Sequence, residues 1–224
     1  MNSAARVTKK PKPGVPLPPA IPTQPVRRFT VDEYHRMLEA GVLKEREPYE
    51  LINGWIIRKM VVYPPHNYAV NVLMELFMKL HGSGATLRIQ QPITTANSEP
   101  EPDVVVAAGS VADYATRNPN PSEVHVLVEV AESSLQYDRT TKLELYAKAK
   151  IQVYWIVNLI DRRVEVYTGP RGGKKPTYKQ QKNYGPGDEV PLFIGGKEVG
   201  RIPVKELFYK GNRGEHQDDK STNR

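Results

Sequence analysis

Two short apolar stretches of the chain each carry one carboxylate, and this combination constrains the fold more than any other feature. Residues 102–106 contain Asp103, and residues 124–130 contain Glu129. β-Branched residues in runs of this length predict buried strands, and a carboxylate among them is costly to bury unless another charge compensates it. Two adjacent strands could present both carboxylates to one hard cation such as Mg²⁺. Alternatively, Asp103 caps a turn and Glu129 lies at an exposed strand end.

The residues before these runs predict a helix, a hairpin and a second helix. Residues 30–33 have the pattern of a capping box, and Gly41 is placed to end the helix that follows. Residues 49–57 predict a hairpin around Asn53-Gly54, because this pair accepts the positive φ angles of a two-residue turn. Its first strand carries a third carboxylate, Glu50. A helix is predicted over 67–80, with His66 just before it, where a histidine commonly caps the helix or faces solvent.

The residues after them predict more strands and one further helix. A strand containing Gln91 is expected over 86–95, and Asp138 is placed to cap a helix over about 139–150, on which Lys142 and Tyr146 share a face. Further strands are predicted over 153–158, 163–167, 187–193 and 197–203, with a basic, mobile turn over 169–176. This order predicts a mixed α/β (α+β) fold, with helices packed on a sheet and additional β-hairpins.

Composition narrows the class of protein. With 224 residues and no cysteine, the chain is expected to form one domain over 27–210 without disulfides or thiol chemistry. No apolar run is long enough to span a membrane, and no hydrophobic region follows the basic N-terminus, so a cytoplasmic location is expected. Residues 1–26 are rich in proline and predict a disordered basic arm, and residues 211–224 predict a disordered polar tail.

The net charge of +7 is concentrated near the ends of the chain. Residues 1–28 contain six basic and no acidic side chains, and residues 170–224 contain 12 basic and seven acidic ones. The segment between them holds the remaining 14 basic and 18 acidic residues, a net charge of −4. Basic arms of this kind can add salt-sensitive affinity for phosphates, although such tails are more often only solvated.

Four ionisable residues form the candidate site: Glu50, Asp103, Glu129 and Lys142. Carboxylates on strands together with a lysine are suited to phosphodiester hydrolysis, because they can hold one or two Mg²⁺ ions that polarise the phosphate and lower the pKa of a water. The lysine then orients or deprotonates that water. Three carboxylates would repel one another without a cation, so their grouping predicts a metal. Alternatively, Lys142 is an exposed helix residue paired with Asp138 at i,i+4.

The order of several motifs resembles the Uma-two family of restriction endonucleases. The motifs are Tyr-Glu-Leu-Ile-Asn-Gly (49–54), Pro-Pro-His (64–66), Gln91-Pro92, Pro-Asp-Val (102–104), Val-Glu-Val-Ala-Glu-Ser-Ser (128–134), Asp138-Arg139 with Lys142 and Tyr146, and Tyr-Trp-Ile-Val (154–157). The resemblance covers about residues 28–170. It implies the restriction-endonuclease-like, PD-(D/E)xK fold and a Mg²⁺-dependent endonuclease, with Mn²⁺ as a substitute, acting on DNA.

The same resemblance assigns roles to single residues. It implies that Asp103, Glu129 and Glu50 are metal ligands and that Lys142 is the catalytic lysine. Gln91, His66 and Tyr146 are candidates for a supporting shell. In the wider superfamily a lysine stands two residues after the acid, and here that position is Ala131, so the resemblance implies a lysine moved onto the helix. The usual Leu-Ser-Pro-Ser stretch reads Ala-Glu-Ser-Ser (131–134).

Two other classes of function remain open at this stage. A non-catalytic nucleic-acid-binding protein on the same scaffold would bind DNA in a salt-sensitive way that survives Asp103→Asn and needs no divalent ion. A protein-interaction module would form a homodimer through apolar strands around Trp155 and would have no affinity for DNA. A fold cannot decide among these, because function belongs to the site.

Overall fold

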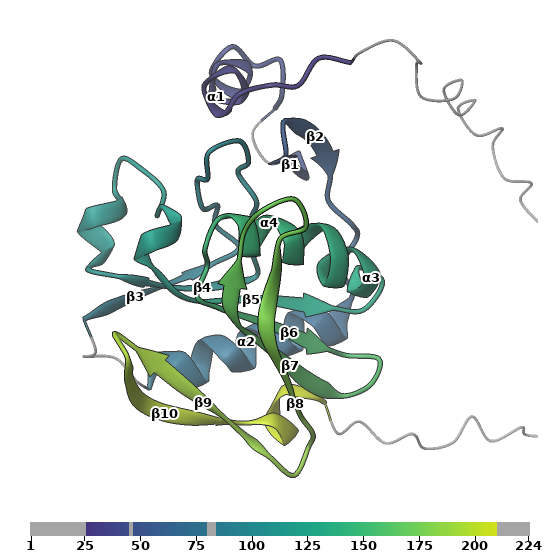
Figure 1. The fold of residues 1–224 in the computed structure, drawn as a ribbon, viewed down its shortest axis with the longest axis vertical. Helices are drawn as coiled ribbons and strands as arrows, with labels where there is room; N and C mark the ends of the chain where they lie inside the picture. Colours follow the sequence, from purple (N-terminus) through teal and green to yellow (C-terminus); the bar gives the residue numbers. More distant parts are fainter. Residues whose placement is uncertain (1–25, 45–46, 80–83, 210–224) are drawn as a thin grey trace, which may run out of the picture.

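The centre of the protein is a six-stranded sheet. The computed structural model describes residues 26–44, 47–79 and 84–209. The arm expected over 1–26 lies outside these ranges except for Val26, and the tail expected over 211–224 lies wholly outside them. The sheet has the order β3-β4-β5-β6-β7-β8 (Figure 1), and its strands are β3 (Ala85–Ile89), β4 (Val104–Ala108), β5 (Val124–Ala131), β6 (Val153–Asn158), β7 (Arg163–Arg171) and β8 (Thr177–Tyr184).

One strand pair in this sheet is parallel. β5 and β6 run in the same direction, with Glu129 opposite Ile156, and all the other pairs are antiparallel. Parallel neighbours need a crossover connection. Here the crossover is helical and consists of α3 (Leu135–Tyr137), a π-helical turn (Asp138–Lys142) and α4 (Leu143–Lys148). The strand that carries Glu129 therefore leads directly into the helical segment that carries Lys142.

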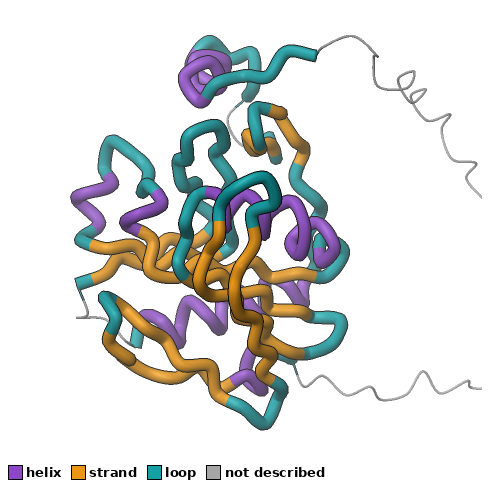
Figure 2. Tube along the Cα trace, viewed as in Figure 1, coloured by secondary structure: helices purple, strands orange, loops and turns teal. Residues whose placement is uncertain are grey.

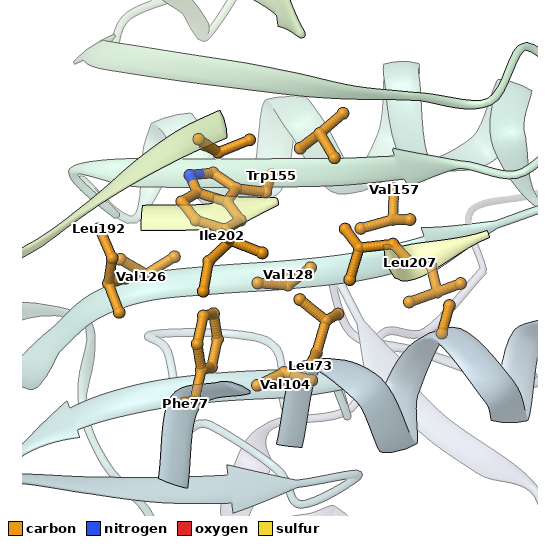
Figure 3. Packing of buried hydrophobic residues seen from close by; sticks show 14 of the residues in the cluster. Leu73, Phe77, Val104, Val126, Val128, Trp155, Val157, Leu192, Ile202 and Leu207 are labelled. Carbon is orange, nitrogen blue, oxygen red and sulfur yellow. The ribbon is translucent and has the colours of Figure 1, made fainter. Parts of the chain in front are cut away.

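One face of the sheet packs against α2 (Pro64–Met78) and a C-terminal hairpin. Leu73 and Phe77 of α2 point toward Val104, Val128 and Trp155 on the strands (Figure 3), and the Phe77 and Trp155 rings meet edge to face with centroids 6.1 Å apart. The hairpin of β9 (Glu189–Ile194) and β10 (Lys197–Pro203), with a 3₁₀ helix (Val204–Leu207), completes this core. Trp155 is only 1% exposed, so the strands around it do not offer the dimer surface that the sequence suggested.

The opposite face packs against α4. Leu145, Tyr146 and Ala147 of this helix are buried with Leu127 and Ile156 of the sheet, and helical segments therefore lie on both sides of the strands (Figure 2). Successive side chains of a strand point to opposite faces. Because Val126, Val128 and Val130 belong to the core beneath α2, the intervening Glu129 lies on the α4 side. Both faces of β5 are thus covered, which explains its nearly continuous apolar sequence.

The N-terminal elements form a small layer beside the sheet. Helix α1 (Val31–Glu39) begins at the predicted capping box, in which Thr30 and Glu33 bond each other's backbone amides. The predicted hairpin is also confirmed as β1 (Tyr49–Ile52) and β2 (Trp55–Arg58), with φ of 51° at Asn53 and 81° at Gly54. Backbone hydrogen bonds between Leu51 and Glu99 attach β1 to the connection between β3 and β4. Two further 3₁₀ helices cover Val111–Tyr114 and Pro121–Glu123.

Several boundaries differ from the sequence prediction for physical reasons. Helix α2 begins at Pro64 rather than at residue 67, because proline is well tolerated in the first turn of a helix. The strand expected over 86–95 ends at Ile89, where Gln90 takes a φ of 49° and turns the chain. Strand β8 was not predicted, because its residues are mostly polar and it lies at the edge of the sheet. β7 extends to Arg171, into the start of the expected basic turn over 169–176, and β8 begins directly after that turn at Thr177.

Candidate active site

A pocket of about 340 Å³ opens between the β1–β2 hairpin, the start of α2, the ends of β3 to β5 and the helical crossover. Six carboxylates line it: Glu50, Glu101, Asp103, Glu129, Glu132 and Asp138. The basic side chains that line it are Arg58, Lys59 and Lys142, together with His66. Its rim includes four successive exposed apolar residues, Met60, Val61, Val62 and Tyr63. The excess of carboxylates makes the pocket favourable for a cation.

Lys142 joins two of these carboxylates at the floor of the pocket. Its Nζ lies 2.7 Å from Oε2 of Glu50 and 3.3 Å from Oε1 of Glu129. All three side chains are buried, with 4–6% exposure. Sequence spacing suggested a second arrangement, an exposed Lys142 paired with Asp138, and the structure shows that this alternative is wrong. The residue at the usual lysine position, Ala131, is buried in the core against α4, so the helix supplies the ammonium group instead.

Tyr146 adds a hydrogen bond to the same cluster. Its hydroxyl group donates to Oε1 of Glu129 at 2.6 Å, one turn of helix beyond Lys142. The spacing of Lys142 and Tyr146 along the helix therefore brings both side chains to one carboxylate, as their shared face indicated. Tyr146 is fully buried, so Glu129 is held between the sheet and α4.

Asp103 lies beside this cluster and is held by backbone and side-chain donors. Its Oδ2 atom accepts a hydrogen bond from the backbone N–H of Val130 at 2.8 Å and lies 3.0 Å from Nε2 of His66. Because β4 and β5 are neighbours, Asp103 directly before β4 reaches the residue after Glu129 on β5. The two carboxylates singled out by the sequence are therefore neither a turn cap nor an exposed strand end.

The structure places His66 and the predicted glutamine differently from the sequence analysis. His66 is in the first turn of α2 and only 6% exposed, so the expectation that it caps the helix or faces solvent is wrong. Gln91 is exposed and does not line the pocket. Its neighbour Gln90 does, and its amide lies 3.5 Å from Oδ1 of Asp103. The positive φ of Gln90 ends β3 and directs this side chain to the site.

Burial and mutual charge shift the pKa values of these groups. Burial raises the pKa of Glu129 to about 8, because desolvation outweighs the attraction of Lys142, and Asp138 and Asp103 raise it further. Burial lowers the pKa of Lys142, but the charges of Glu129 and Glu50 raise it by more, to well above its ordinary value. The pKa of His66 is also raised, since Asp103 outweighs the effect of burial. The two carboxylates in contact with Lys142 therefore favour its protonated form.

Asp138 belongs to the pocket rather than to a helix cap. It is 3% exposed and is the first residue of the π-helical turn that ends at Lys142. The helical segment already begins at Leu135, so the cap predicted at Asp138 is wrong. A π-helical turn is rare and is frequently found at functional sites. The signal available in the sequence was the spacing of Asp138 and Lys142, which places both on one side of a helix.

Two buried polar atoms in the pocket have no hydrogen-bond partner among the described residues. They are Nδ1 of His66 and the hydroxyl oxygen of Tyr137. A buried polar atom without a partner costs about 1–3 kcal/mol. Both residues line the pocket. The pocket therefore presents unused hydrogen-bonding capacity to whatever enters it.

The carboxylates do not form a ready-made metal cage. No group of three or more His, Asp or Glu side chains within the described ranges has the arrangement of a metal site. The three converging carboxylates do not by themselves require a metal, because the ammonium group of Lys142 already compensates part of their charge. One lysine shared by Glu50 and Glu129 still leaves an excess negative charge when both are ionised. The carboxylate oxygens of the pocket are the donors that Mg²⁺ prefers, so the residues present fit a divalent cation.

A comparison with protein families identifies the chain. The Uma2 family, described as "Putative restriction endonuclease", matches residues 31–197. The chain belongs to the Uma2 family. The matched range includes the β1–β2 hairpin, the six-stranded sheet and the helical crossover, and hence every residue of the pocket. No curated protein matches the chain.

A solved structure has the same fold as this Uma2 chain. It is described as a "putative nuclease belonging to DUF820" from Anabaena variabilis. The TM-score is 0.60 at 17% sequence identity, over 80% of this chain and 97% of that one. The two chains therefore share a mixed α+β fold, which in this protein contains a six-stranded sheet. Among the described residues of this Uma2 protein, no helix has the length and apolarity needed to cross a membrane.

Proposed function

We propose that the chain is a divalent-metal-dependent endonuclease that hydrolyses the phosphodiester bonds of DNA with a PD-(D/E)xK-type site. The observation that supports this most directly is the contact of Lys142 with Glu129 at 3.3 Å. Asp103 lies beside this contact, because its Oδ2 atom accepts a hydrogen bond from Val130, the residue after Glu129 on β5. A strand acid, a second acid on the adjacent strand and a lysine are thus combined in one pocket. Membership of a family described as restriction endonucleases supports the same reaction class.

Asp103 and Glu129 are the proposed ligands of a Mg²⁺ ion, with Glu50 as a third acid and Mn²⁺ as a substitute. A bound divalent cation supplies Lewis acidity toward the phosphate and lowers the pKa of a water. His66 and Gln90 hold the carboxylate of Asp103 in place, and Tyr146 holds that of Glu129. Such supporting bonds orient metal ligands.

Lys142 acts as a fixed positive charge in this proposal. The charges of Glu129 and Glu50 raise its pKa, so the protonated form is favoured and the side chain is a poor acceptor of a proton from water. Its ammonium group instead orients Glu50 and Glu129 and stabilises negative charge that develops on the phosphate. The sequence left open whether the lysine orients or deprotonates the water. This proposal does not use Lys142 as the group that deprotonates it.

The test is a calorimetric titration of Mn²⁺ and Mg²⁺ into the wild type, Asp103→Asn and the control Glu144→Gln, combined with cleavage of plasmid DNA. Glu144 is exposed on α4 outside the pocket, so its variant has the same change of charge without affecting the site. We expect binding and cleavage in the wild type and the control, and loss of both in Asp103→Asn. EDTA should abolish cleavage by the wild type.

The same experiment distinguishes the alternative function. Absence of metal binding from the wild type, together with salt-sensitive DNA binding that survives Asp103→Asn, would contradict the nuclease proposal. It would instead favour a non-catalytic DNA-binding protein in which Lys142 is the permanent counter-charge of the acids. Urea unfolding of each variant checks that it is folded, so that a loss of binding or cleavage is not caused by unfolding.

A further inference from the structure

Asp138 is a buried carboxylate in the pocket. The proposed function, with its metal ligands and Lys142, gives this side chain no role. It lines the pocket and is 3% exposed. Within the part of the chain that the structure describes, no lysine, arginine or histidine forms an ion pair with it. A carboxylate in this position is costly to bury unless its environment serves a function.

The position of Asp138 is fixed by contacts on two sides. Its backbone carbonyl accepts a hydrogen bond from the hydroxyl group of Tyr154 at 3.1 Å. The next residue, Arg139, forms two hydrogen bonds with the fully buried Glu165 of β7. The π-helical turn is therefore attached both to β6 and to β7. Asp138 and Lys142 begin and end this turn, and both are buried at the same pocket.

The other buried acids of the pocket already have partners. Glu50 is bonded to Lys142 at 2.7 Å, and Glu129 accepts a hydrogen bond from Tyr146 at 2.6 Å. Asp103 accepts one from Val130 at 2.8 Å. Each of these three carboxylates therefore has a lone pair that is already engaged by a donor. Asp138 is thus the buried acid whose lone pairs are most available to a water in the pocket.

The surroundings of Asp138 also give it a suitable basicity. Burial raises its pKa to about 6, against the lowering effects of Ser134 and Lys142, and with further increases from Asp103 and Glu50. The ionisable groups that face it are Lys142 on its own helical segment, Asp103 before β4, Glu50 on β1, Glu129 on β5 and His66 on α2. A base with a pKa just below neutrality is ionised at pH 7 and still accepts protons effectively.

We propose that Asp138 is the general base that takes a proton from the attacking water; this inference rests on the proposed nuclease function. The water oxygen keeps the electron pair of its broken O–H bond and forms the new bond to phosphorus, while the proton passes to a carboxylate oxygen of Asp138. The bond from phosphorus to the leaving sugar oxygen breaks, and that oxygen keeps the electron pair and takes a proton from solvent. Asp138 then returns its proton to solvent, which completes the cycle.

The test compares Asp138→Asn with the wild type and with Glu144→Gln. We expect kcat of Asp138→Asn to fall by about 10²–10⁴-fold, which is the usual contribution of a general base, while KM and the affinity for Mn²⁺ stay close to those of the wild type. The kcat of the wild type should decline on the acidic side, and the part of this decline that comes from protonation of Asp138 should be missing from the residual activity of the variant. Glu144→Gln should behave as the wild type.

A second variant, Asp138→Ala, makes the test specific for a base. Added formate should restore part of its cleavage activity, because a small carboxylate can enter the space left by the side chain and accept the proton. Wild-type kcat in Asp138→Asn, loss of Mn²⁺ binding in that variant, or failure of formate to restore Asp138→Ala while urea unfolding shows it folded, would each overturn the inference. A wild type that neither binds Mn²⁺ nor cleaves DNA would instead overturn the proposed function, and the inference with it.

Discussion

Lys142 provides the positive charge on which two buried carboxylates depend. Its ammonium group contacts Glu50 and Glu129, and all three side chains are nearly inaccessible to solvent. Breaking a buried ion pair by removing one partner is strongly destabilising, because the remaining charge is left without compensation. The same residue therefore contributes both to the proposed chemistry and to the stability of the folded chain.

This dual role predicts a large effect of Lys142→Met on stability. We expect the free energy of unfolding at pH 8 to fall by about 3–5 kcal/mol. The loss should be smaller at pH 5, where the carboxylates can take up protons. Urea unfolding measures both values.

A double variant controls for the change of shape. Adding Glu50→Gln to Lys142→Met removes one of the uncompensated charges, so the pair should be less destabilised than the sum of the single variants. Strict additivity, within about 0.5 kcal/mol, would show that the ion pair does not couple these residues.

At the residue scale, the sequence could identify the charges but not all of their partners. Carboxylates within apolar runs marked Glu50, Asp103 and Glu129, because such positions require compensation. The sequence predicts Gln91 for the site, whereas the structure brings its neighbour Gln90 there, since the register at the end of a strand depends on one backbone angle. The sequence also predicts a helix cap at Asp138, because capping and buried aspartates look alike in sequence.

At the scale of elements, the β6–β7 hairpin is coupled to the helical crossover by one buried acid. Glu165 of β7 has no exposed surface and accepts hydrogen bonds from Arg139, Asn158 and Tyr167. Burial raises its pKa, but these hydrogen bonds outweigh burial and lower the pKa to about 2. Because Arg139 follows Asp138 directly, this acid helps to hold the π-helical turn.

The lowered pKa of Glu165 predicts a loss of stability in acid. Its pKa in the folded state lies below the ordinary value of 4.5, so its stabilisation is present above that pH and is lost as the pH falls toward about 2. The expected contribution is about 3 kcal/mol. Urea unfolding of the wild type and Glu165→Gln should show a large difference at pH 6 that shrinks near pH 3. An equal difference at both pH values would contradict this linkage.

The elements that the sequence predicted well are those set by local chemistry. The capping box at Thr30 and the Asn53-Gly54 turn were found because each depends on a few adjacent residues. The edge strand β8 is not predicted because its interior, residues 179–183, is entirely polar and carries no apolar alternation to recognise. The π-helical turn was missed because it is stabilised by Tyr154 and Glu165, which lie far from it in the sequence.

At the scale of the whole molecule, the charge is unevenly distributed along the chain. Residues 1–25 carry four basic and no acidic side chains, and residues 210–224 carry four basic and three acidic ones. Most of the net charge of +7 therefore lies in these two terminal segments. The pocket itself is lined by more acids than bases. The terminal segments thus carry the charge that attracts a polyanion such as DNA, and the pocket carries the residues of the proposed chemistry.

This distribution predicts how binding to DNA depends on salt. Affinity falls with salt concentration in proportion to the number of phosphates that basic side chains neutralise. We expect a chain reduced to residues 26–209 to bind more weakly at low salt and with a shallower slope of log K against log salt than the full chain. Fluorescence anisotropy with a labelled duplex measures both slopes. Equal slopes would show that the terminal segments do not contact the phosphates.

The parallel pairing of β5 and β6 determines when in the life of the chain its proposed chemistry can begin. Glu50 and Lys142, which are bonded to each other, are 92 positions apart, and the crossover that carries the lysine joins the parallel strands β5 and β6. A nascent or cleaved chain that ends before this crossover possesses the acids and lacks the ammonium group. Under the proposed function, such a chain would lack the lysine that contacts Glu50 and Glu129, and hydrolysis would require the crossover to be complete.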